Sequence, residues 1–133
     1  MNRIGMLAGA AAIIALGGCM NQQGAGRNGH AEDVPAVRVA GEAQSCIPIA
    51  SIQESRVRDD WTIDFRTGAN RWYRNSLPHR CSGLGQERAF SYSTSLSQLC
   101  SSDIIRVLGS AGGEPWELGS CGLGQFVPVE MVK

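Results

Sequence analysis

The sequence predicts a mainly β fold, a small antiparallel meander that forms a barrel or a sandwich with few short helical turns. Apolar and polar residues alternate with a period of two in several short runs, which is the pattern of strands that bury one face. Turn-forming residues separate these runs at short intervals, as they do in antiparallel sheets. Four cysteines in the same region predict that disulfide bonds staple the domain.

The clearest strand begins at Trp61, where apolar residues alternate with polar ones as far as position 66. The turn 67–70 follows it, and 71–74 is its expected hairpin partner. The other expected elements are strands at 52–57, 90–94, 104–108 and 125–132 and short helical turns at 48–52 and 95–99. Pro128 marks the last of these strands as an edge strand or a bent one, because proline donates no hydrogen bond to a sheet.

Residues 1–18 have the pattern of a signal peptide. Arg3 precedes an apolar run from Ile4 to Leu16, and two glycines follow it before Cys19. A basic start, a short apolar stretch and small residues at the cleavage site are typical of exported proteins. As a helix the apolar run would span about 20 Å, against about 30 Å for a hydrocarbon core, so we do not expect a permanent membrane span.

The segment Leu16-Gly17-Gly18-Cys19 resembles the lipobox of bacterial lipoproteins. In those proteins the cysteine thiol receives a diacylglycerol group, and the amine exposed by cleavage is usually acylated, for example with palmitate. The resemblance implies a lipid anchor at Cys19, with an ordinary secretory leader as the alternative. Several acyl chains anchor a protein stably because each buried methylene contributes about 0.8 kcal/mol. Met20 follows in place of aspartate, which by resemblance to the sorting pattern favours the outer membrane, facing the periplasm, over the inner membrane.

Composition divides the rest of the chain into a tether and one domain. Residues 19–42 are expected to be the lipidated cysteine and a flexible tether, because they contain no aromatic residue and little else to bury. A short edge strand at 34–39 is an equally open alternative. All eight aromatic residues lie further along the chain, so 43–133 is expected to form a single β-rich domain. Acidic and basic residues balance, so no overall basic field predicts nucleic-acid binding.

Four cysteines remain once Cys19 is assigned to the anchor, and in an exported protein an even number is expected to pair. Of the three connectivities, we expect Cys81–Cys100, which closes a local loop around the 90–94 strand, and Cys46–Cys121, which ties the beginning of the domain to its end. A metal site that includes His79 and Cys81 is the alternative. Zinc sites usually contain closely spaced cysteine pairs, which this sequence lacks, so we expect neither a metal nor a cofactor.

Six sequence blocks occur in an order that resembles one family. The blocks are Cys46-Ile47, 56–65, 73–78, 81–84, 99–105 and 121–126. They are similar to the DUF6491 group, small exported bacterial proteins, often lipoproteins, that form a domain of unknown function. The resemblance covers about residues 44–130, with Ser82 as a departure where the pattern has proline. It implies an exported domain of this kind and transfers no catalytic residue.

Arginine is concentrated in the middle of the domain, with seven arginines between positions 56 and 88 against four acidic residues. Guanidinium groups bind carboxylates and phosphates, and aromatic rings stack on sugars or bases. The candidate anion- or glycan-binding face consists of Arg56, Arg58, Arg66, Arg71, Trp72, Tyr73 and Arg74. An anionic envelope polymer, a lipid head group or a protein partner would suit it. The alternative is that these arginines lie on the solvent side of strands and pair with the acids.

A hydrolytic site is the competing hypothesis. His79 would be the base, because the other histidine lies in the tether, and the carboxylate would come from Asp59, Asp60, Asp64 or Asp103. The sequence contains no local nucleophile motif such as G-x-S-x-G. We expect instead a surface histidine, a solvated acidic pair in a turn and an Asp103 that bonds local amides. The sequence therefore favours a lipid-anchored envelope protein with a binding or structural role over a small hydrolase of cell-wall or lipid material.

Overall fold

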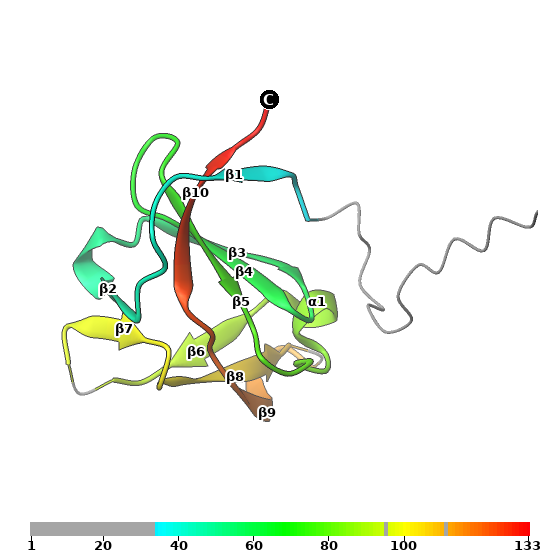
Figure 1. Cartoon of the computed structure of the whole chain (residues 1–133). Helices are drawn as coiled ribbons and strands as arrows, with labels where there is room; N and C mark the ends of the chain where they lie inside the picture. Colours follow the sequence, from blue (N-terminus) through cyan, green and yellow to red (C-terminus); the bar gives the residue numbers. More distant parts are fainter. Residues whose placement is uncertain (1–33, 95, 111) are drawn as a thin grey trace, which may run out of the picture.

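The computed structural model describes residues 34–94, 96–110 and 112–133 (Figure 1). Its strands are β1 Val37–Val39, β2 Cys46–Pro48, β3 Glu54–Asp59, β4 Thr62–Arg66, β5 Trp72–Ser76, β6 Phe90–Tyr92, β7 Gln98–Cys100, β8 Ile104–Gly109, β9 Trp116–Gly122 and β10 Phe126–Met131. Among the described residues, helical structure consists of one 3₁₀ turn, Ile49–Ser51, and one short helix, α1 Leu84–Glu87. Within the described ranges no helix is long and apolar enough to cross a membrane.

The strands form three antiparallel sheets. The largest has the order β1-β10-β5-β4-β3, the second has the order β6-β8-β9, and β2 and β7 pair on their own. Figure 1 shows the two smaller sheets below the five-stranded one. The expected mainly β fold is therefore confirmed, and of the two expected forms the described residues take the sandwich-like one rather than a closed barrel.

The core lies between the five-stranded sheet and the other two. Ile63 and Phe65 alternate with polar residues along β4, and both are fully buried on its inner face. The Phe65 ring meets Phe126 of β10 at 5.6 Å between centroids and Phe90 of β6 at 6.2 Å, both edge to face. Such aromatic pairs contribute about 0.5–1.5 kcal/mol beyond the burial of their area. These contacts join the five-stranded sheet to the three-stranded one.

A buried asparagine connects β5 to the loop before β10. Asn75 is fully buried, and its amide both donates to the Gly124 oxygen at 2.7 Å and accepts from the Gly124 nitrogen at 2.8 Å. Gly124 lies so close to β5 that a Cβ there would be 2.1 Å from the Ser76 oxygen. Glycine is therefore required at this position by the close approach of two backbones.

The folded unit begins earlier than residue 43. Of the two alternatives for 34–39, the structure shows the strand, because β1 pairs with β10 at the edge of the five-stranded sheet. β10 therefore lies between β1 and β5, so of the two alternatives that Pro128 indicated, an edge strand or a bent one, the edge strand is wrong. Proline is tolerated there because the β1 ladder ends at Val129, and the next contact uses only the Pro128 oxygen, which accepts from the Ala40 nitrogen at 2.8 Å.

The two disulfide bonds are Cys46–Cys100 and Cys81–Cys121, so the expected pairing of Cys81 with Cys100 and of Cys46 with Cys121 is wrong. Cys46 and Cys100 lie directly opposite each other on β2 and β7, with Cα atoms 4.0 Å apart. Cys121 of β9 lies opposite the buried Ile105 of β8, so its side chain is on the inner face of the three-stranded sheet, where it is bonded to Cys81. The error arises because β2 and β7 had not been recognised as partner strands.

Three other elements differ from the expectations. The helical turn expected at 48–52 is present as the 3₁₀ turn, but in place of the one expected at 95–99 the described residues include the strand β7. Helix α1 and strand β9 were not expected. Six of the seven β9 residues are exposed, so its sequence has no buried stripe that would have indicated a strand.

Candidate functional site

The seven residues of the candidate binding face lie in three different places. Most of them occupy the outer surface of the five-stranded sheet: Arg56 and Arg58 on β3, Arg66 on β4, and Trp72 and Arg74 on β5. Tyr73 points to the opposite side because successive strand residues alternate, and it packs against the core. Arg71 precedes β5, at the end of the β4–β5 hairpin. Residues that are neighbours in the sequence are therefore separated in the structure, Tyr73 by the alternation of the strand and Arg71 by its place next to the turn.

Asp64 organises the outer surface. Its side chain is fully buried, and it accepts from Arg58 Nε at 2.8 Å and from Arg74 through both Nε at 2.8 Å and Nη2 at 2.9 Å. Both arginine side chains are themselves only 15% exposed. A carboxylate taken out of water is stable only when charged donors surround it in this way. Arg58 and Arg74 therefore serve the sheet itself.

Trp72 is covered by the arginines around it. Its exposed fraction is 7%, and the guanidinium carbons of Arg56 and Arg58 lie 5.4 Å and 5.7 Å from its ring centroid. This is cation–π geometry, in which the cations face the electron-rich ring. The indole is consequently not open for a sugar to stack on. Trp72 instead supports two arginines of the predicted face, Arg56 and Arg58.

Glu54 neutralises the remaining outer-surface arginines. It accepts from Arg56 and from Arg66 Nε at 2.9 Å, and Arg66 also donates to Gln53 at 3.0 Å. These hydrogen bonds, first from Arg56 and then from Arg66, lower the pKa of the Glu54 carboxyl from its ordinary value of 4.5. The four outer-surface arginines thus share two carboxylates, which is the paired arrangement that the sequence left open as an alternative.

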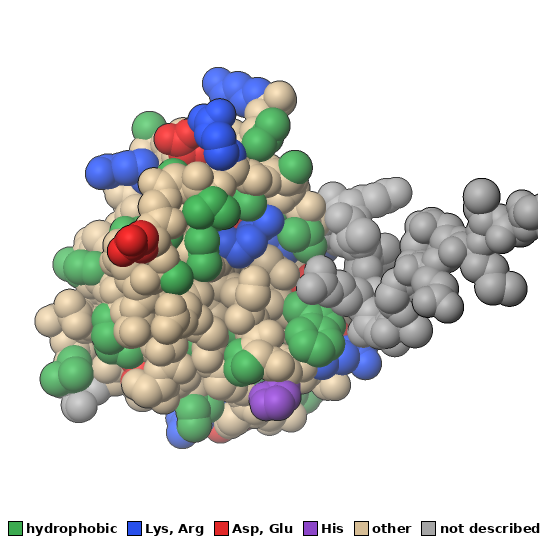
Figure 2. Space-filling view, viewed as in Figure 1, with side chains coloured by type: hydrophobic (Ala, Val, Ile, Leu, Met, Phe, Trp, Pro, Cys, Tyr) green, Lys and Arg blue, Asp and Glu red, His purple; other side chains and the backbone are tan. Residues whose placement is uncertain are grey.

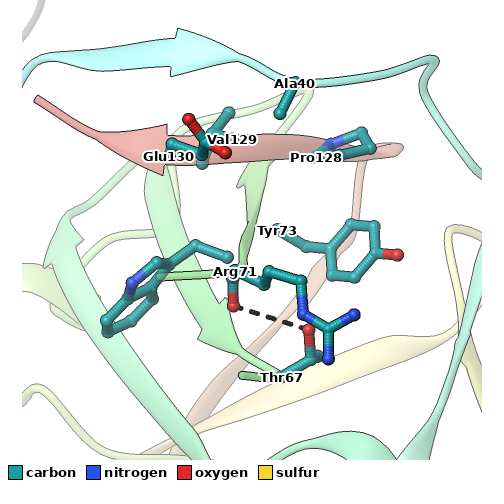
Figure 3. Close-up of a pocket in the computed structure, with 8 residues that line it drawn as sticks. Ala40, Thr67, Arg71, Tyr73, Pro128, Val129 and Glu130 are labelled. Carbon is teal, nitrogen blue, oxygen red and sulfur yellow. Dashed lines mark hydrogen bonds between the residues drawn. The ribbon is translucent and has the colours of Figure 1, made fainter. Parts of the chain in front are cut away.

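Arg71 lines a hollow of about 230 Å³ beside β10. The hollow is bounded by Ala40, Thr67, Arg71, Trp72, Tyr73, Pro128, Val129 and Glu130 (Figure 3). The Arg71 backbone oxygen accepts from Thr67 N at 2.9 Å and from Thr67 Oγ1 at 3.4 Å, which closes the hairpin turn. A Cβ at Gly68 would lie 2.6 Å from Arg71 Nε. The turn glycine therefore makes room for the arginine to lie across it.

The Arg71 guanidinium has no hydrogen-bonded or ion-paired acid among the described residues. Glu130, across the hollow, is engaged by Arg38. Figure 3 shows the guanidinium beside Thr67 and near the ring of Tyr73, with Pro128 on the far side. In Figure 2, acidic and basic side chains lie interspersed near the ends of β1 and β10. The hollow thus combines a cation that has no hydrogen-bonded or ion-paired acid with an apolar wall of one aromatic and one proline ring, and its acid, Glu130, is engaged by Arg38.

Two further hollows contain arginines. One of about 340 Å³ lies along β3, with Arg56, Arg58 and Arg88 among its lining residues. The other, of about 320 Å³, lies on the outer face of the three-stranded sheet and is lined by Ser93, Ser102, Asp103, Ile104, Arg106 and Ser120. Arg56 and Arg58 already bond carboxylates, and Arg106 lies 3.5 Å from Glu117. In both hollows acidic side chains of the protein therefore compete with an anionic ligand.

The elements of the hydrolytic hypothesis do not meet among the described residues. His79 is exposed in the loop after β5 and makes no hydrogen bond or ion pair with any described carboxylate. Asp60 accepts from Arg80 Nε at 2.9 Å and from the Gly85 nitrogen at 2.8 Å. Asp59 accepts from the Trp61 nitrogen at 2.8 Å. These two aspartates are only 5% and 6% exposed, so the expectation of a solvated acidic pair is wrong.

Asp103 and Cys81 also have structural partners. Asp103 accepts from the Cys100 nitrogen at 2.7 Å, which confirms that it bonds a local amide. Cys81 is bonded to Cys121, so it is not a thiolate that joins His79 at a metal. In the part of the chain that the structure describes, no three His, Cys, Asp or Glu side chains are grouped closely enough to hold a metal ion.

The sequence indicates three residues of the hollow, Arg71, Trp72 and Tyr73, but not the others. Ala40 and Pro128 come from segments at the two ends of the domain, and their chemistry carries no signal of a binding site. Cys19, the signal peptide 1–18 and residues 19–33 of the expected tether lie outside the described residues. Comparisons with protein families, with curated proteins and with solved structures give no match to this chain.

Proposed function

We propose that this chain is a lipid-anchored protein of the cell envelope whose folded domain binds an anionic group. The leader and the lipobox resemblance support attachment through Cys19 to the outer membrane, on the periplasmic side. The similarity to the DUF6491 group, whose members are often lipoproteins, supports the same assignment. The observation that carries the binding role is the Arg71 guanidinium, which faces a hollow without a carboxylate partner among the described residues.

The residues of the hollow suit a carboxylate or phosphate that is attached to a sugar ring or another partly apolar group. A guanidinium presents parallel N–H donors that match two oxygens of a carboxylate or a phosphate. The Tyr73 ring and Pro128 supply a surface on which a sugar ring or the glycerol part of a lipid head group packs. A volume of about 230 Å³ accommodates one such group rather than a length of polymer. The ligand is therefore a terminal or pendant anionic group of an envelope lipid or polymer.

Titration of the detergent-solubilised full chain tests this proposal. The probes are inorganic phosphate, galacturonate and monomeric dihexanoyl phosphatidylglycerol, and calorimetry measures their affinity. Arg71→Gln is expected to weaken binding about tenfold or more, because a hydrogen bond to a charged group is worth about 1.5–3 kcal/mol. If phosphate binds as tightly as the other two probes, the site recognises only the anion. If galacturonate or the lipid binds more tightly, the site also recognises the sugar ring or the glycerol part.

Arg106→Gln is the matched control, because Arg106 is also an exposed arginine that lines a hollow but already lies near a carboxylate. Its replacement should leave the affinities unchanged. Arg74, although part of the predicted face, is unsuitable for charge reversal because it bonds the buried Asp64. Equal binding by the native chain and by Arg71→Gln, or no binding of any probe by the native chain, would contradict the proposed anion site.

A further inference from the structure

Strand β9 is an exposed sheet edge. It is the longest strand, with seven residues, and it lies at the end of the three-stranded sheet, where β8 is its strand neighbour among the described residues. The edges of the five-stranded sheet differ from it, because β1 has only three residues and β3 packs against α1. Proteins usually protect edges with short strands, lysine, proline or a covering element. β9 is not short and contains neither lysine nor proline; its charged residue is Glu117, and its ladder with β8 has one register shift.

The two faces of β9 have different side chains. A register shift between Val107 and Leu108 makes Leu118 an extra residue of the strand. Trp116 and Leu118 are 43% and 47% exposed, and both lie next to Gly109, where a Cβ would be 3.0 Å from the Leu118 side chain. They therefore share the inner side of the sheet, beyond the part that the core covers.

Gly119 leaves open space beside these apolar side chains, since a Cβ there would meet nothing within 4 Å. The outer face of the same strand is polar, with Glu117 and Ser120 on it. Ser120 is the cross-strand partner of Arg106 of β8, so this arginine lies beside the serine on the same face, on the side away from the free edge. The free edge thus presents an exposed apolar side chain, Leu118, next to the open space over Gly119. It also presents the acid Glu117, with the cation Arg106 on the neighbouring strand.

We propose that β9 pairs antiparallel with β9 of a second copy of this chain, with Glu117 opposite Ser120 of the second copy. This register places Leu118 against Gly119 of the second copy, so that an exposed apolar side chain meets the open space over a glycine. In a regular strand this register would pair residues whose side chains lie on opposite faces of the sheet. The extra residue at Leu118 shifts the alternation by one, so that each pair has its side chains on the same face. A two-fold axis repeats every contact, as in most homodimers.

Charge complementarity favours a second copy over other partners. In this register Arg106 of the second copy lies two strands from Glu117, a distance of about 9.5 Å, with only a serine between them. The hollow that Arg106 and Ser120 line leaves room for the arginine to extend over that serine. Within one copy Arg106 and Glu117 are half exposed and 3.5 Å apart, so their own ion pair is weak. The symmetric pairing brings each Glu117 toward a second arginine, Arg106 of the other copy, and the two-fold axis repeats this contact.

Photocrosslinking in intact cells tests the pairing with the full chain and does not depend on the anion site. The photoreactive residue p-benzoylphenylalanine replaces Trp116, and illumination is expected to produce, on a reducing gel, a species of twice the chain's mass. Mass spectrometry should join position 116 to the peptide that contains Cys121 of the second copy. The control places the same residue at Val39, which is 65% exposed on the opposite edge of the fold and should give no doubled species.

Charge variants distinguish a contact between copies from one within a copy. Glu117→Arg alone and Arg106→Glu alone should each reduce the crosslink about tenfold, and Leu118→Lys should abolish it. When the two charge variants are expressed together, each chain repels its own kind but complements the other, so the doubled species should return. The proposal fails if position 116 crosslinks only to another protein or to lipid, if no doubled species forms, or if co-expression of folded variants does not restore it.

Discussion

The arginines around Asp64 and the arginine at the hairpin end lie within twenty positions of one another in the sequence, yet their surroundings differ. Arg58 and Arg74 are in the middle of strands, where the pleat and the neighbouring strand bring them onto a buried carboxylate. Arg71 lies at the end of a turn, where the acid on the neighbouring strand β10, Glu130, is engaged by Arg38, and the Arg71 side chain lines a hollow. A β sequence rich in arginine can therefore contain arginines that hold the sheet together beside an arginine that is left to face a hollow, and the acids on neighbouring strands distinguish the two.

The largest effect is expected from Asp64→Asn. The change leaves Arg58 and Arg74 nearly buried without their shared counter-ion, and breaking a buried ion pair from one side costs about 3–5 kcal/mol. Urea unfolding measures the loss in the free energy of unfolding. Glu130→Gln, which removes an exposed partner of Arg38, is the control and should cost little. A loss below about 1 kcal/mol for Asp64→Asn would mean that Asp64 does not organise the sheet.

Arg74→Lys is expected to have an intermediate effect. Lysine keeps the charge but loses the two-pronged contact with Asp64, so the free energy of unfolding should fall by about 1–3 kcal/mol. Arg66→Lys provides the comparison, because Arg66 makes a single, partly exposed bond to Glu54 and should lose less. Equal losses in the two variants would show that the fork geometry at Asp64 is unimportant.

A smaller effect, dependent on pH, is expected from Glu54→Gln. The Glu54 pKa is lowered in the folded chain, so its ion pairs stabilise the fold fully above the ordinary value of 4.5 and lose this effect as the pH falls through the lowered pKa. Thermal unfolding should show the native chain more stable than the variant at pH 7. The difference should shrink as the pH falls below 4.5, and a difference independent of pH would rule out the carboxylate as its cause.

The smallest effect on stability is expected from Arg71→Gln, which should change the free energy of unfolding by less than about 0.5 kcal/mol. The same variant should have the largest effect on ligand affinity, which sharpens the contrast with Asp64. Arg71→Lys retains a cation and should recover part of the affinity, because it keeps the charge but not the fork. A clear destabilisation by Arg71→Gln would assign Arg71 to the scaffold as well.

Predictions from local patterns succeeded where the pattern reflects burial on one face. β4 and β5 were anticipated because Ile63 and Phe65 alternate with polar residues and a turn follows them. β9 was missed because it is held by its hydrogen bonds to β8 rather than by burial of its own side chains. The small β7 was missed because its partner β2 lies about fifty residues away. For the same reason the candidate site was recovered only in part, since the sequence indicates Arg71 but not the segments that enclose it.

The sequence by itself determined the mainly β class, the strands of the central hairpin, the presence of disulfide bonds and the richness in arginine, because composition and the two-residue period are local properties. Only the tertiary structure decided which cysteines pair, that β10 lies inside its sheet, that Asp59 and Asp60 are buried, and that Arg71 is the arginine of the predicted face without an acid among the described residues. Each of these depends on which distant segments become neighbours. Strand order decides that, and the strand order results from the packing of the whole chain rather than from any one stretch of it.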